Sequence, residues 1–267
     1  MARITNGIQF EGSIGNISAY KQKGSDKVIL RTKGGASKLK ISTSPRFAMV
    51  RRYNSEWGAC SKMGMAIRHA TIGLRHLSDF NISSPLNAIT KAIQKTDANG
   101  ILGERGIYLS LNRDMVLGFS FNKQLLLDSV LRFPVQITVD RVGKSAQITV
   151  PRIIPDVNLK QYGKNPLFRL VASLGVVSDF VFNTELNKYE PVNTALHGKS
   201  VTVYSVWHTV KEVVEEQQIM LSFPFDDVLT EHDSILIAFG VEFGYPLSEA
   251  FVMTAKNVGC AKIISVG

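Results

Sequence analysis

The chain has little cysteine, no long apolar run and no apolar leader, and each absence excludes a class of protein. Its two cysteines, Cys60 and Cys260, are too few and too far apart for a disulfide framework or a thiolate metal site. No stretch approaches the roughly 20 consecutive apolar residues that span a bilayer, and the first residues lack the apolar region of a secretory signal. We therefore expect no membrane span, and a location in the cytoplasm or in a virion or similar particle.

Motifs for phosphate binding and nucleophilic catalysis are also missing. Gly143-Lys144-Ser145 and Gly198-Lys199-Ser200 look like the end of a phosphate-binding loop, but each lacks the upstream glycine and runs into a predicted strand. No Gly-x-Ser-x-Gly is present. The sequence thus predicts no catalytic residue, cofactor, metal or small-molecule substrate, and we expect a protein that is not an enzyme. A hydrolase or metal enzyme, a third hypothesis, needs a metal at His208 or at the Asp226–Asp233 cluster.

Charge is plentiful but unevenly spread along a chain whose 45% hydrophobic residues can bury a sizeable core. The net charge is +9, yet residues 1–78 alone carry +11, with 14 Lys and Arg against three acidic residues. Between Lys211 and Lys256 there are nine Asp and Glu and no Lys or Arg. Such a split is typical of proteins that bind nucleic acid or that align one copy against the next. Solvated faces, or contacts within one molecule, explain it equally well.

The first 43 residues, here called the N-terminal arm, predict strands without a core of their own. Apolar residues alternate with polar ones over 17–32, on either side of the turn-like Lys23-Gly24-Ser25-Asp26, which indicates a β-hairpin. Gly34-Gly35 then interrupts the pattern. Because a two-stranded hairpin is marginal in water, we expect the arm to dock on the rest of its chain or on another chain.

Two helices are expected next, over residues 44–114. Ser44 and Pro45 are typical of a helix start, and one apolar stripe then follows at steps of three and four residues. The stripe comprises Phe47, Val50, Tyr53, Trp57, Cys60, Met63, Ile67, Ala70, Leu74 and Leu77. A shorter helix begins at Ser84-Pro85 and ends near Asn99-Gly100, and we expect the two helices to pack as a hairpin or on a sheet.

Residues 115–267 change to short β-type runs separated by turn residues. About ten such runs, with no helix long enough for a parallel crossover, favour an antiparallel sandwich or barrel. A strand at 118–122 and one helical element at 210–216 are among the expectations. The predicted fold class is therefore α+β: the N-terminal β-hairpin arm (1–43), a two-helix segment (44–114) and an antiparallel β-sandwich (115–267).

Three stretches carry a resemblance to a known family. They are Gly15 to Lys21, with Gly-x-Ile at its start and Tyr-Lys at its end, Arg31-Thr32-Lys33-Gly34-Gly35, and Asn54-Ser55-Glu56-Trp57-Gly58. Residues 1–80 thereby resemble a family of bacterial proteins, of Bacteroidota type, that often occur as several related copies, and the remainder resembles it more loosely. The resemblance implies a repeated building block and no activity.

The leading hypothesis is a non-enzymatic structural protein that self-assembles into a fibre, tube or shell, as in a phage-like particle. A strand of the arm would join the sheet edge of the next copy, and opposite charges would align the two. The expected interface comprises Lys21, Lys23, Lys27, Arg31 and Lys33 on the arm and Glu215, Glu216, Asp226 and Asp227 on the neighbour.

The alternative hypothesis is a nucleic-acid-binding accessory protein that places basic side chains on phosphates. Its candidate residues are Arg46, Arg51, Arg52, Arg68 and Arg75. Tyr53 and Trp57 lie among them, but their place on the apolar stripe predicts core positions rather than platforms for bases. Homo-oligomerisation and nucleic-acid binding therefore both stay open.

Overall fold

The computed structural model describes residues 2–3, 10–21, 28–248 and 251–267, without the side chains of residues 2, 3, 256 and 257. The chain divides into two compact units, Met1–Arg51 and Arg52–Gly267. Helices and antiparallel sheets both contribute to it, which confirms the α+β prediction. None of the helices in the described part of the chain has the length and apolar character needed to cross a membrane.

The first unit contains a small antiparallel sheet in the order β1-β4-β3-β2. Its strands are β1 (Ala2–Arg3), β2 (Gly12–Ile14), β3 (Ile17–Lys21) and β4 (Val28–Thr32). The pairing of β3 with β4 confirms the predicted hairpin, and the register sets Ala19 opposite Leu30. After the strands come α1 (Lys38–Thr43), capped by the Ser37 hydroxyl, and the 3-10 turn η1 (Pro45–Phe47), which begins at the predicted Ser44-Pro45.

The long helix of the prediction is present but is shorter, and six of the ten residues of its stripe are buried. Helix α2 spans Ala48–Ala70, and the chain then continues as the 3-10 helix η2 (Ile72–Leu77). Cys60, Met63 and Ile67 are fully buried, whereas Tyr53 and Trp57 are 53% and 52% exposed. The prediction that these two aromatics are core residues was therefore wrong, because the layer that buries the helix begins at its third turn.

Helix α3 (Ser83–Lys95) packs beside α2, as predicted. The Thr90 hydroxyl donates a hydrogen bond to the carbonyl oxygen of Cys60 at 2.9 Å, and Leu86 and Ile93 share one apolar core with α2. Short helical turns follow along the connecting chain, namely η3 (Leu109–Leu111), η4 (Arg113–Met115) and α4 (Leu127–Val130).

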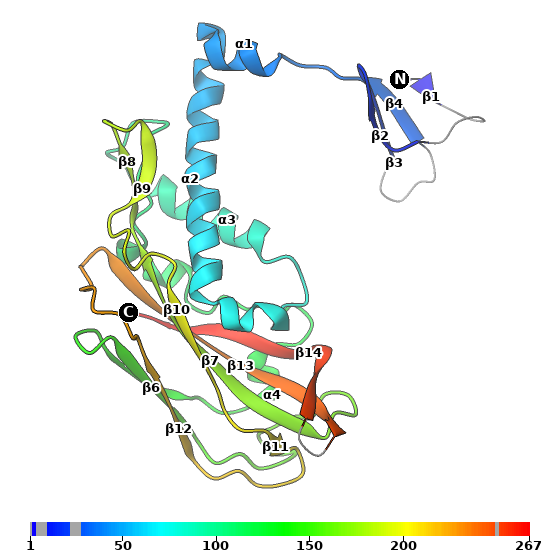
Figure 1. Ribbon diagram of the computed structural model, residues 1–267, viewed down its shortest axis with the longest axis vertical. Coiled ribbons are helices and arrows are strands. Elements are labelled where there is room, and N and C mark those ends of the chain that lie inside the picture. The colour runs from blue at the N-terminus through cyan, green and yellow to red at the C-terminus, as the bar shows by residue number, and fades with distance from the viewer. Residues whose placement is uncertain (1, 4–9, 22–27, 249–250) are drawn as a thin grey trace. The chain divides into compact units, whose positions relative to one another are not determined.

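Two antiparallel sheets complete the second unit (Figure 1). The larger sheet has the order β10-β7-β13-β14, with β11 also paired to β7, and the smaller has the order β12-β6-β5; β8 and β9 form a separate hairpin. The strands are β5 (Gln136–Asp140), β6 (Ser145–Val150), β7 (Leu167–Ser178), β8 (Phe180–Asn183), β9 (Lys188–Pro191), β10 (Ser200–Tyr204), β11 (His208–Thr209), β12 (Gln217–Ser222), β13 (Asp233–Ser248) and β14 (Phe251–Val266).

The larger sheet is buried on both faces, so the second unit has three layers. Leu170 and Leu174 of β7 join the core shared with the smaller sheet, while Val171 and Val177 join the core shared with the helices. Strands covered on both sides carry continuous apolar runs rather than an alternating pattern. This explains why β7 and β13 hold the longest apolar stretches of the chain.

Two elements differ from the prediction in this unit. Residues 118–122 form no strand, because their pairing with the outer edge of β14 is limited to an isolated bridge between Ser120 and Lys262. Residues 210–216 form no helix, since Val214 instead exchanges backbone hydrogen bonds with Ile153 at 2.8 and 3.0 Å. Both segments are loops anchored by two or three backbone hydrogen bonds, a situation that apolar periodicity does not encode.

Candidate functional site

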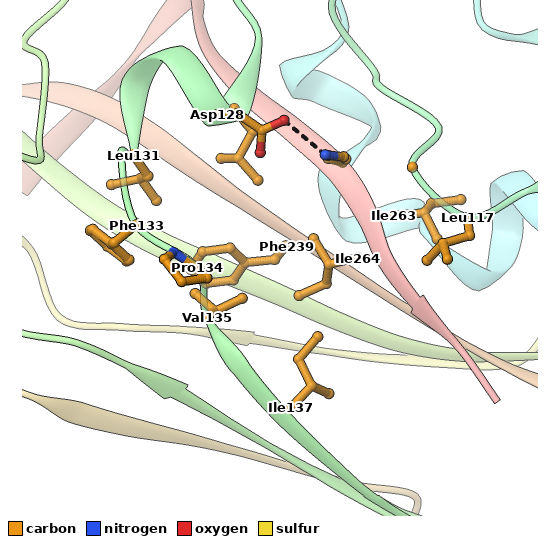
Figure 2. Close-up of a pocket in the computed structure, with 13 residues that line it drawn as sticks. Leu117, Asp128, Leu131, Phe133, Pro134, Val135, Ile137, Phe239, Ile263 and Ile264 are labelled. Atoms are coloured by element: carbon orange, nitrogen blue, oxygen red, sulfur yellow. Dashed lines mark hydrogen bonds and ion pairs between the residues drawn. The ribbon is translucent and has the colours of Figure 1, made fainter.

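The open side of the sandwich holds an apolar pocket of about 330 Å³. It lies where the edge strand of each sheet, β14 and β5, has no further strand beside it. Figure 2 shows Phe239 between Pro134 and Ile264, with Val135, which precedes β5, and Ile137 of β5 below. A single ion pair, Asp128 to Lys262 at 2.8 Å, accompanies these apolar side chains. The pocket suits apolar side chains or a chain of methylene groups.

The described residues of the first unit have almost no core. Only Ala19 is buried among them, at 3% exposure, although the sheet has one apolar face. The register places Ile14 and Ile17 on the same face as Ala19, Leu30 and Lys21, while the other face carries Ser13, Ser18, Tyr20, Ile29 and Arg31. Ile14 is 63% exposed. The described residues thus present an apolar sheet face, here called the arm face, that is only partly covered: Ala19 is buried, whereas Ile14 and Ile17 are exposed.

The basic residues predicted for the interface lie on or beside this sheet. Lys21 ends β3, Arg31 is in β4 with its guanidinium 5.4 Å from the Tyr20 ring centroid, and Lys33 follows β4. All three side chains are exposed. Lys23 and Lys27 lie outside the described residues.

The four acidic residues predicted for the interface do not form one patch. Glu215 and Glu216 precede β12, whereas Asp226 and Asp227 follow it, so the six residues of the strand separate the two pairs by about 20 Å. Glu215 already pairs with Arg152 at 3.3 Å, and Asp227 with Lys199 at 3.7 Å. Glu216 and Asp226 are exposed, and no ion pair to either is present in the described part of the chain.

Two further acidic residues of the same stretch are buried instead. Glu242 accepts hydrogen bonds from His76 and Arg169, and the Arg169 guanidinium stacks on Tyr204 and Trp207 at 4.2 and 4.6 Å from their ring centroids. Asp233 accepts hydrogen bonds from the Thr230 amide and the Asn193 side chain. The acidic stretch therefore contributes less surface charge than its composition suggests.

The arginines predicted to contact phosphates differ in availability. Arg51 donates two hydrogen bonds of 2.8 Å to the carbonyl oxygens of Ile41 and Ser44, so it anchors the turn between α1 and α2. Burial, and then the neighbouring Arg75, lower the pKa of Arg68, whose Nη1 is buried without a partner. Arg46, Arg52 and Arg75 are exposed.

The Asn-Ser-Glu-Trp-Gly stretch contains a buried carboxylate. Glu56 is fully buried and accepts hydrogen bonds from Lys91 at 2.6 Å, from Arg105 at 2.7 Å and from the Gly103 amide at 2.9 Å. Burial would raise the pKa of Glu56, but these hydrogen bonds outweigh it and lower the pKa to about 2. The cluster ties α2 to α3 and to the following loop, which is a structural role.

The side chains that the sequence suggested as metal ligands do not form a cluster in the described part of the chain. In the described ranges, no group of three or more His, Cys, Asp and Glu side chains could hold a metal ion. Within the Asp226–Asp233 segment, Asp233 faces inward and His232 contacts Asp179 at 3.2 Å. His208 packs against the Phe168 ring, with ring centroids 5.5 Å apart.

A second cavity, here called the arginine pocket, was not found from the sequence. It has a volume of about 580 Å³, and its walls come from loops far apart along the chain. The lining residues are Tyr108, Ser110, Leu111, Arg113, Arg141, Asp179, Glu231 and His232. No local motif joins these residues. Their loops meet through the pairing of β7 with β13, the bridge of Ile107 with Phe180 and the hydrogen bonds of Arg141 to Thr230 and Asp233.

Comparison with known proteins found no matching family model, no similar curated protein and no similar solved structure.

Proposed function

We propose that the chain is a non-enzymatic structural protein that self-assembles, with the arm face of one copy bound to the β-sandwich of another. The observation that carries this proposal is the arm face itself, a sheet in which one described side chain is buried. A sheet with an apolar face needs a covering layer for independent stability. Exposed apolar surface of this kind is typical of protein interaction sites.

The open side of the sandwich is the binding surface that fits best. The smaller sheet ends there in the edge strand β5, and the apolar pocket lies between β5 and β14, whose outer edge already bonds residues 118–121 through Ala261 and Ile263. An added strand could donate backbone hydrogen bonds to an edge and place alternate apolar side chains into the pocket. Because the donor and acceptor surfaces differ, the contact is head-to-tail and propagates as a ring or a filament.

Charge complementarity would then align the copies. Lys21, Arg31 and Lys33 supply positive charge on or beside the sheet, and Lys23 and Lys27 add to the charge of the same stretch of sequence. Glu216 and Asp226 offer exposed carboxylates before and after β12. Glu215 and Asp227 would have to exchange their present partners, Arg152 and Lys199. Exposed ion pairs contribute less than about 1 kcal/mol each, so charge sets direction and association rate more than affinity.

The test uses two neighbouring residues on opposite faces of β2. Ile14→Asp places a carboxylate on the arm face, and Ser13→Asp places the same charge on the other face. We expect light scattering of the wild-type protein at low salt to show species that grow with concentration. Ile14→Asp should shift them towards the monomer, while Ser13→Asp should assemble like the wild type. A wild-type protein that stays monomeric at high concentration and low salt would overturn the proposal, as would equal effects of both substitutions.

A second candidate function, nucleic-acid binding, gains support from the exposure of Tyr53 and Trp57. These aromatics lie one helical turn apart on the exposed part of α2 and can stack on bases, while Arg52, directly before Tyr53, is also exposed. The affinity of the protein for nucleic acid should fall log-linearly with salt concentration, and Trp57→Ala should weaken the binding. No binding of single-stranded DNA or RNA at 50 mM salt would remove this candidate.

A further inference from the structure

The arginine pocket contains two guanidinium groups that have no carboxylate partner among the described residues. Arg141 donates hydrogen bonds to the carbonyl oxygens of Thr230 at 2.9 Å and Asp233 at 3.0 Å. Arg113 approaches that same Asp233 carbonyl oxygen at 3.4 Å and the Ser234 hydroxyl at 3.3 Å, both long for hydrogen bonds. The two cations thus converge on one neutral oxygen, which cannot balance their charge.

Two further observations show that this arrangement is unsatisfied. Nη1 of Arg141 is buried without a hydrogen-bond partner, a state that proteins normally avoid. Burial, and then the charge of Arg141, lower the pKa of Arg113, while Asp179 raises it in part. The two guanidinium groups are therefore held close together at a cost in free energy. A negatively charged hydrogen-bond acceptor between them would reduce that cost.

The carboxylates of the pocket are directed elsewhere. Asp179 is fully buried and accepts hydrogen bonds from the amide and hydroxyl of Ser110, at 2.9 and 2.6 Å, and contacts His232 at 3.2 Å. Glu231 lies at the rim with an 89% exposed side chain, 3.8 Å from Nε2 of His232. In the described part of the chain, neither carboxylate consequently forms an ion pair with Arg113 or Arg141.

We propose that the arginine pocket binds the phosphoryl group of a small phosphorylated molecule. Guanidinium groups bind phosphate oxygens through two parallel hydrogen bonds, and a phosphoryl group has enough oxygens to engage two of them. Tyr108 also lines the cavity. A cavity of about 580 Å³ also accommodates the remainder of such a molecule, beside the exposed side chain of Leu111.

Calorimetric titration of the full chain with inorganic phosphate, at fixed ionic strength and pH 7, tests the site. We expect saturable binding that Arg141→Gln and Arg113→Gln each weaken at least about tenfold, because hydrogen bonds between charged groups contribute about that much to affinity. Arg132→Gln is the matched control, since Arg132 is exposed and lies outside the pocket. Absence of saturable binding, or an equal loss with Arg132→Gln, would overturn the proposal.

Two further experiments identify the ligand and avoid the problem of misfolded variants. Tighter binding of glucose 6-phosphate than of phosphate would support a phosphorylated metabolite, and equal binding of both would support a phosphoryl site with no contact to the remainder. Acetate binding as tightly as phosphate would contradict the phosphoryl assignment. On the wild-type chain, phosphate should protect Arg113 and Arg141, but not Arg132, from phenylglyoxal, as mapped by mass spectrometry. Equal modification of all three with and without phosphate would count against the site.

Discussion

Gly175 of β7 lies directly against the backbone of Ala70, the last residue of α2, so that a Cβ atom at Gly175 would overlap the Ala70 carbonyl oxygen. The contact joins the helical layer to the middle of the larger sheet. Ser173, two residues away on the same face, reinforces it by donating a hydrogen bond to that same carbonyl oxygen at 3.1 Å. Close packing at this point fixes where α2 meets the sheet.

Gly175→Ala should therefore destabilise the second unit. The added methyl group has no space, and overpacking of this kind costs about 1–3 kcal/mol. Gly58→Ala, within α2, is the matched control, because a Cβ atom there would meet nothing within 4 Å. The control should raise stability by about 0.5–1 kcal/mol through helix propensity. Urea denaturation followed by circular dichroism measures both, and equal midpoints for the two variants would contradict the packing described.

Glu56→Gln should destabilise the chain more than a surface substitution does. It leaves Lys91 and Arg105 without their shared carboxylate, and removing one partner of a buried ion pair costs about 3–5 kcal/mol. Glu104→Gln, at an exposed residue of the adjoining loop, should change stability by less than about 0.5 kcal/mol.

Glu56→Gln should also remove part of the acid sensitivity of the folded chain. The pKa of Glu56 is about 2 in the folded chain, against about 4.3 when unfolded, so the unfolded chain takes up a proton first as the pH falls. The stabilising effect of the Glu56 carboxylate is complete above about pH 4.5 and is lost as the pH falls towards 2. Denaturation midpoints between pH 5 and 3 should fall less steeply for Glu56→Gln than for the wild type, and parallel slopes would disprove this assignment.

Trp57 and Met63 lie on the stripe predicted from the sequence, yet they should respond differently to truncation. Met63 is fully buried, and its replacement by Ala should cost about 2–5 kcal/mol. Trp57→Ala should change stability by less than about 1 kcal/mol, because its side chain is half exposed. Thermal melts of both variants provide the comparison. A large loss in Trp57→Ala would mean that the aromatic is covered in solution.

His197 should make the protein less stable below about pH 6.5. Burial lowers its pKa, so the unfolded chain binds a proton at a pH where the folded chain does not. In the folded chain, Nδ1 instead accepts a hydrogen bond from the Ser178 amide at 3.2 Å. Denaturation between pH 7.5 and 5.5 should show a shallower decline for His197→Asn than for the wild type. An unchanged slope in His197→Asn would contradict this assignment.

Local patterns predicted most of the elements but few of the surfaces. The hairpin of β3 and β4 and the start at Ser44-Pro45 depend on neighbouring residues, so alternation and capping signals were sufficient. Whether Tyr53 and Trp57 are buried depends on where the sheet ends beside α2, which the helix pattern does not contain. The arginine pocket depends on loops around residues 110, 141, 179 and 232 meeting in space, and no spacing in the sequence encodes that meeting.

The β13–β14 hairpin extends beyond the layers that bury its middle. β13 pairs with β7 only as far as Gly244, after which its partner is β14 alone, and Tyr245, Leu247, Phe251 and Met253 are exposed. A projecting two-stranded ribbon opens locally at little free-energy cost, whereas Leu236 and Phe239 open only when the whole unit unfolds. One continuous strand thus joins the most slowly exchanging amides of the protein to some of the fastest, and a protease would reach this ribbon without first disturbing the core.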